Sequence, residues 1–163
     1  MTPTHAAALQ VATESFAMLT AALDGVPDEA AGWMPAPATN SLAVLATHSV
    51  TSARYWLGAG AGTTGSMRRY QQNERSASFS VQGDRIEDLV ALVRRFQPEL
   101  EAMLSEGTAT SLEATVSFDT DAPARSGVEC LFHGLAHLRE HTGQAQLMRD
   151  LWLAAHPVPD APR

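Results

Sequence analysis

Three histidines are the residues of this sequence whose types and spacing could do chemistry. His137 and His141 lie four residues apart in a segment of helical periodicity, so their imidazoles share one helical face and could chelate one ion. His48 lies between Leu45 and Ser52, on the inward side of an earlier helical segment. Three neutral imidazoles that leave coordination positions open are typical of a catalytic metal site rather than a sealed structural one. On spacing alone, a chance pair and a core role for His48 remain open alternatives.

Other polar residues lie near the same face of the last helical segment. His133 precedes His137 by one turn, and it could be a neighbouring group or an alternative ligand, because three histidines in a row on one helix cannot all bind one ion comfortably. His133 or Glu129 could assist proton transfer, but we favour a structural role for both. Cys130 shares the face and is interpreted as a small apolar residue. The two terminal histidines, His5 and His156, are expected at the surface.

Four segments of helical periodicity must position these residues. The first begins at Thr2-Pro3, and the second begins after Asn40 or Ser41 as the capping residue. The fourth is the longest, from about Ser126 to about His156. The expected ends are Gly25 and Pro27 for the first segment and Gly58-Ala59-Gly60 for the second.

The third helical segment is expected to open at Gly83-Asp84, with Glu87 completing a capping box. Pro98 lies within it and should kink the helix or split it, because proline removes a helical hydrogen bond. The connections at 63–82 and 108–125 are long and polar. Each contains a short alternating stretch, 79–81 and 114–118, and these two stretches could pair as a small β-hairpin. The chain is therefore predicted to be one all-α domain, 1–163, built as a four-helix bundle.

Composition excludes several classes of function. The net charge is -7, with 11 basic residues against 18 acidic ones and no basic tract, which argues against nucleic-acid binding. No apolar run approaches the roughly 20 residues that span a bilayer, so no membrane partner is expected. The first turns lack Lys and Arg and contain Glu14 within an apolar stretch, unlike a signal peptide. A single cysteine fits a reducing compartment, and we expect a cytoplasmic protein.

Two strings of residues resemble a known family. The string from Asn40 to His48, followed by Ala53-Arg54-Tyr55-Trp56, resembles the DinB/YfiT-like superfamily. The string from His137 to Gln144, followed by Leu147-Met148-Arg149, does so as well. The order of the helices also matches, and the resemblance covers essentially the whole chain.

The resemblance implies a four-helix bundle of up-down-down-up topology with a divalent metal, most often zinc or nickel, bound by His48, His137 and His141. It implies that Gln144 lies near the open face of the site. Members of the family with established activity are metal-dependent thiol transferases that use a low-molecular-weight thiol such as mycothiol or bacillithiol. Transfer of such a thiol to a small electrophile is therefore the expected activity. A metal-dependent hydrolase of amide or ester bonds is the alternative, and a non-catalytic bundle with a structural or ligand-binding metal is the second one. The resemblance also implies a homodimer.

Overall fold

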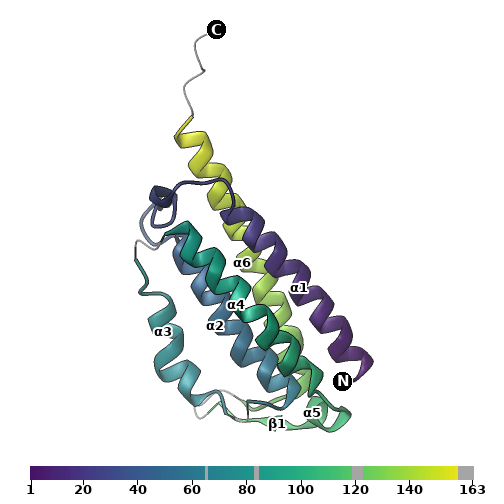
Figure 1. Cartoon of the computed structure of the whole chain (residues 1–163). Coiled ribbons are helices and arrows are strands. Elements are labelled where there is room, and N and C mark those ends of the chain that lie inside the picture. Colours follow the sequence, from purple (N-terminus) through teal and green to yellow (C-terminus); the bar gives the residue numbers. More distant parts are fainter. Residues whose placement is uncertain (65, 83–84, 119–122, 158–163) are drawn as a thin grey trace.

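Four long helices form the body of the molecule. The computed structural model describes all residues except 65, 83–84, 119–122 and 158–163. The long helices are α1 (Pro3–Leu23), α2 (Leu42–Ala61), α4 (Ile86–Ser105) and α6 (Gly127–Ala155). Helix α6 packs on α2 and α1, and α4 packs on the same two helices. Helices α1 and α6 run in one direction and α2 and α4 in the other (Figure 1), so the predicted bundle and its topology are confirmed.

Short elements fill the connections between the long helices. A 3-10 turn, η1 (Asp28–Ala30), follows α1, and a π-helical turn, η2 (Tyr70–Glu74), continues directly into α3 (Arg75–Ser78). Helix α5 (Ala109–Glu113) precedes two short strands, β1 (Thr115–Val116) and β2 (Arg125–Ser126). The segment from η2 to α3 lies beside α2 (Figure 1).

Polar caps begin the helices at the predicted places. The Thr2 side chain accepts the His5 N–H, and Pro3 occupies the first helical position of α1. Ser41 caps α2 by accepting the Val44 N–H. Ser126 and Glu129 form a reciprocal capping box at the start of α6.

The predicted end of α2 at residues 58–60 is wrong. The helix continues to Ala61 and ends at Gly62, which adopts the left-handed conformation with φ 83°. Gly60 has a packing role, because a Cβ atom there would lie 2.7 Å from Leu131 Cβ on α6. These helical glycines therefore permit close helix contact instead of stopping the helix.

Pro98 does not split the third long helix, so the predicted split is wrong, while the alternative of a kink stays a prediction. Helix α4 is continuous from Ile86 to Ser105 with Pro98 inside it. Proline has no N–H group, so the carbonyl of Arg94 lacks the hydrogen bond that position 98 would otherwise donate. Pro98 and Arg94 are both exposed, so water can bond that carbonyl instead. Buried Phe96 and Leu100 hold the helix to the core on both sides of the proline.

The predicted opening of this helix at Gly83-Asp84 lies outside the described residues. The helix begins at Ile86, whose N–H donates to Asp28 Oδ1 at 2.9 Å. The side chain of Glu87 accepts a bond from Arg85 at 2.9 Å, and the predicted capping box with position 84 lies outside the described residues.

The prediction that the stretches 79–81 and 114–118 pair with each other is also wrong. Strand β1 pairs antiparallel with β2, which belongs to the same connection. The two long connections meet instead at an isolated parallel bridge between Ser66 and Ser117. The stretch 79–81 lies outside the sheet, and its Phe79 packs on a histidine of the bundle, as described below.

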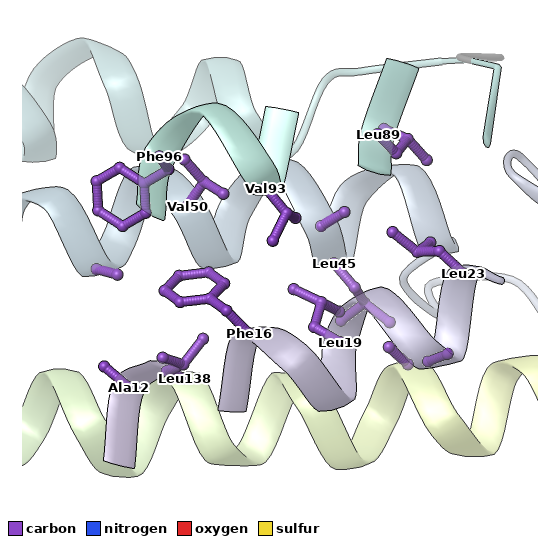
Figure 2. Close-up of a cluster of buried hydrophobic side chains, with 14 of the residues drawn as sticks. Ala12, Phe16, Leu19, Leu23, Leu45, Val50, Leu89, Val93, Phe96 and Leu138 are labelled. Atoms are coloured by element: carbon purple, nitrogen blue, oxygen red, sulfur yellow. The ribbon is translucent and has the colours of Figure 1, made fainter. Parts of the chain in front are cut away.

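The core lies between all four long helices. Phe16 of α1 and Phe96 of α4 meet edge to face with their ring centroids 5.5 Å apart (Figure 2). Leu19, Leu45 and Leu138 pack around them and are almost completely buried. A core of this size accounts for the stability of the bundle without requiring a metal ion.

Helix α1 is long and apolar enough to cross a membrane by length and composition, which the sequence analysis did not anticipate. Its apolar side is nevertheless packed inside the protein: Ala12, Phe16 and Leu19 are fully buried, against α4 and α6. Core helices of globular bundles pass the same test. The absence of a membrane partner remains a prediction.

Candidate metal centre

The three predicted histidines meet between α2 and α6. His137 Nε2 lies 3.0 Å from His48 Nε2 and 3.1 Å from His141 Nε2. His48 is 1% exposed, His141 is 6% exposed, and His137 is half-buried. Among the described residues they form the group that could hold a metal ion, with one ligand atom from each residue within 4.8 Å of the others.

The spacing of the nitrogens suits a metal polyhedron. Imidazole nitrogens bind zinc at about 2.0–2.1 Å, so two ligands at octahedral or tetrahedral angles have nitrogens about 2.9–3.4 Å apart. The two observed separations fall inside that range.

His48 is held in one tautomer by Ser78. The Ser78 hydroxyl donates to the Arg75 carbonyl at 2.7 Å, so Ser78 Oγ accepts a bond from His48 Nδ1 at 2.8 Å. The proton of His48 is then on Nδ1, and Nε2 has a free lone pair. A histidine that binds a metal through Nε2 requires this tautomer.

Gln144 does the same for His141. Its Nε2 donates to Glu140 Oε1 at 3.3 Å, which leaves its Oε1 to accept from His141 Nδ1 at 2.9 Å. Gln144 therefore contacts His141 and orients its ring, while its place at an open face of the site stays a prediction. The Nε2 lone pairs of His48 and His141 both face His137 Nε2. A single proton on His137 Nε2 could form a hydrogen bond to only one of these two lone pairs. A cation would satisfy all three, so the donor set fits a metal ion.

The lowered pKa values of His48 and His137 keep these two rings neutral. Burial, followed by the neighbouring His141 and His137, lowers the pKa of His48 to about 3. Burial, followed by His141 and His133, lowers the pKa of His137 to about 4. Both rings are therefore unprotonated near neutral pH, as metal ligands must be.

Two residues of the centre escaped sequence reasoning. Phe79 packs on His48 with ring centroids 4.1 Å apart and the rings tilted by 37°, and Ser78 anchors the same imidazole. Both come from the α3 segment, about thirty residues after His48. Both lie in a connection whose sequence shows no helical periodicity, so no signal could have marked them.

His133 lies outside the triad. Its ring packs on Trp56 at 4.0 Å between centroids and stacks parallel to His137 at 5.8 Å. Burial, followed by Arg125, lowers the pKa of His133. It is therefore a neutral neighbour of the ligands, packed against an aromatic ring.

Glu129 belongs to the cap of helix α6, and Cys130 packs in the protein interior. The Glu129 carboxylate accepts the Ser126 N–H and hydroxyl, each at 2.7 Å, which lowers the pKa of Glu129. Cys130 is fully buried, and burial raises its pKa to about 11, so its thiol is not a nucleophile near neutral pH.

The expectation for the terminal histidines is half right. His156 is exposed and stacks on Trp152. His5 is fully buried, contrary to expectation, because its Nε2 bonds the Gly60 carbonyl at 3.1 Å and its Nδ1 bonds Thr2 Oγ1 at 2.8 Å. It connects α1 to the end of α2 and lies far along α2 from His48.

Two cavities lie beside the centre. One, of about 280 Å³, includes Gln144, Leu45 and Leu147 in its lining. The other, of about 630 Å³, includes Phe79 and Val44. The two cavities share Thr39 and Asn40 in their linings. The first contacts Gln144, which bonds His141, and the second contacts Phe79, which packs on His48.

Comparison with known proteins agrees with this architecture. The sequence profile of the DinB superfamily matches residues 12–145, which includes all three histidines. No curated protein matches the sequence. A matched region of this extent, with the bundle and the histidine triad in place, shows that the chain belongs to the DinB superfamily.

Proposed function

We propose that this protein is a metal-dependent enzyme that transfers a low-molecular-weight thiol, such as mycothiol or bacillithiol, to a small electrophile. The observation that supports it is the meeting of three Nε2 atoms from two helices, with two of the rings fixed by hydrogen bonds at Nδ1. A divalent ion, zinc or nickel, with open positions at such a centre lowers the pKa of a bound thiol or water and so supplies a nucleophile near neutral pH.

The residues of the chain contribute position and environment. His48, His137 and His141 would hold the ion, and burial keeps His48 and His137 neutral. Ser78 and Gln144 fix two rings, so less reorganisation is needed when the ion binds. The cavities beside Gln144 and Phe79 offer space for a small molecule next to the centre.

A hydrolase of amide or ester bonds is the second candidate. The same metal ion would lower the pKa of a bound water as well as that of a thiol, so the donor set suits hydrolysis too. A purely structural metal is the third candidate, and the extensive apolar core weighs against it.

Turnover with and without thiol separates the three. The metal-loaded protein is assayed with mycothiol, bacillithiol and glutathione against a chromogenic electrophile, and with activated esters and amides without thiol. Saturable turnover with one thiol, lost in His48→Ala, is the expected result. Ester or amide turnover without thiol would establish the hydrolase instead. No turnover in either assay, with a melting temperature raised by metal, would establish the structural role.

Cytoplasmic location and a homodimer are further parts of the proposal. A single, fully buried cysteine supports a location in a reducing compartment. Exposed Phe132 beside an apolar groove between α1 and α6 supports association of two copies.

A further inference from the structure

Arg75 carries a positive charge beside the metal centre. Its guanidinium packs on the Phe79 ring, and this contact fixes its position relative to His48. Its guanidinium carbon lies 5.2 Å from the centroid of the Phe79 ring, and that ring packs on His48 with a centroid distance of 4.1 Å. The backbone carbonyl of Arg75 also accepts the Ser78 hydroxyl, the group that anchors His48. Arg75 and His48 are thus connected through two short chains of contacts.

Arg75 is connected to His48 through Phe79, and it forms no ion pair within the part of the chain that the structure describes. Among the described residues, no carboxylate lies within ion-pair distance of it. Glu140 is the acidic group near His137, and its Oε1 accepts from Gln144. Arg69, on the same helical segment, is by contrast paired with Glu74 at 2.8 Å.

An arginine in this arrangement is suited to an anionic ligand. Its flat face is occupied by Phe79, so the N–H groups at its edge remain to donate to a planar carboxylate. The side chain is exposed, so a ligand in solvent can reach it.

We propose that Arg75 binds a carboxylate of the small molecule that occupies the centre, so that the thiol or its electrophile is an acid. This inference rests on the proposed function, which does not itself specify the charge of the ligand. It makes Arg75 a residue that sets specificity, with no part in metal binding.

Two thiols of similar size test the proposal on the full-length protein loaded with cobalt(II). 3-Mercaptopropionate carries a carboxylate and 2-mercaptoethanol does not, and the sulfur-to-cobalt absorption band reports the binding of both. Because an exposed ion pair contributes modestly, we expect wild type to bind the acid about five- to tenfold more tightly. In Arg75→Gln that preference should disappear, while cobalt stoichiometry and the Kd of 2-mercaptoethanol stay the same. Arg75→Lys should retain part of the preference.

Arg69→Gln is the matched control, because it removes the same charge from the same helical segment. It should bind both thiols as wild type does. The proposal is overturned if wild type shows no preference, if Arg75→Gln keeps it, or if Arg69→Gln loses as much of it.

Failure of thiol binding itself would count against the proposed function and not against Arg75. If neither thiol produces the band, the same samples are titrated with malonate and followed through the cobalt d–d spectrum. Weaker malonate binding by Arg75→Gln than by wild type supports the proposal. Equal binding, or no binding to wild type, overturns it.

Discussion

Ser78 and Gln144 are the single residues that orient the imidazoles of His48 and His141. Replacing either with alanine removes the acceptor of an Nδ1–H, so the ring can turn or change tautomer although every metal donor is still present. We expect Ser78→Ala and Gln144→Ala each to weaken metal affinity about 10- to 100-fold, the usual cost of losing such support. Zinc titration against a competing chelator measures the change.

Ser76 and Gln146 supply the controls for these two substitutions. Ser76 is exposed on the α3 segment and donates to the Asn73 carbonyl. Gln146 is two residues beyond Gln144 on α6, and it is turned away from the histidine face by helical geometry. Ser76→Ala and Gln146→Ala should keep wild-type affinity, and equal losses in targets and controls would refute the orienting role.

At this scale the sequence predicted the triad but not its surroundings. His48, His137 and His141 lie on helices whose apolar periodicity shows which face is inward. Ser78 and Phe79 reach the site from a connection with no such period, so only the folded chain brings them to His48. Sequence reasoning misplaced His5 because the carbonyl that buries it, that of Gly60, is 55 residues away.

At the scale of elements, the contact between α2 and α6 sets the distance between His48 and the other two histidines. Gly134 lies one turn before Leu138 on α6, and a Cβ atom there would lie 2.9 Å from Trp56 Cβ and from a Leu57 methyl group on α2. Gly134→Ala should force the helices apart, at a cost of about 1–3 kcal/mol in unfolding free energy. We expect weaker zinc affinity together with a lower midpoint of urea denaturation.

Gly143→Ala on the same helix is the control, since no atom lies within 4 Å of the added Cβ. Its better helix propensity should raise stability by up to about 1 kcal/mol and leave zinc affinity unchanged. Close packing of α2 and α6 would not be required for the site if both alanine variants bound zinc as wild type does.

The capping box of α6 is expected to act on stability alone. Ser126→Ala removes the hydroxyl that accepts the Glu129 N–H, and a lost cap of this kind costs about 1 kcal/mol. Urea denaturation should show that loss while zinc stoichiometry remains that of wild type. A matching loss of metal would mean that the start of α6 belongs to the metal centre.

Caps were readable from the sequence because they depend on residues adjacent in the chain, as Thr2, Ser41 and Ser126 illustrate. The predicted stop at Gly60 and the predicted split at Pro98 were wrong because the surroundings of each helix decide the effect of such residues. A neighbouring helix needs the space at Gly60, and solvent on the outer face tolerates the carbonyl that Pro98 leaves unpaired.

At the scale of the whole molecule, the buried triad couples stability to pH. The pKa of His48 is lowered to about 3 and that of His137 to about 4, from an ordinary value of 6.5. The unfolded chain therefore binds more protons than the folded one in this range. The metal-free protein should be most stable above pH 6.5 and should lose stability as the pH falls toward 4 and then 3.

Thermal denaturation of the metal-free protein across this pH range checks the coupling. The His48→Ala variant should show a shallower decline, because one of the two shifted groups is gone. Identical slopes for wild type and variant would place the pH dependence elsewhere in the molecule.

Metal content tests the central claim most directly. Protein expressed without a histidine tag and purified without a nickel column is analysed by elemental mass spectrometry, alongside His48→Ala, His137→Ala and His141→Ala. A single triad predicts about one equivalent of a divalent metal in wild type and loss of that metal in each variant. Less than about a tenth of an equivalent in wild type, or unchanged stoichiometry in His48→Ala, would contradict the assignment of these three histidines as the ligands.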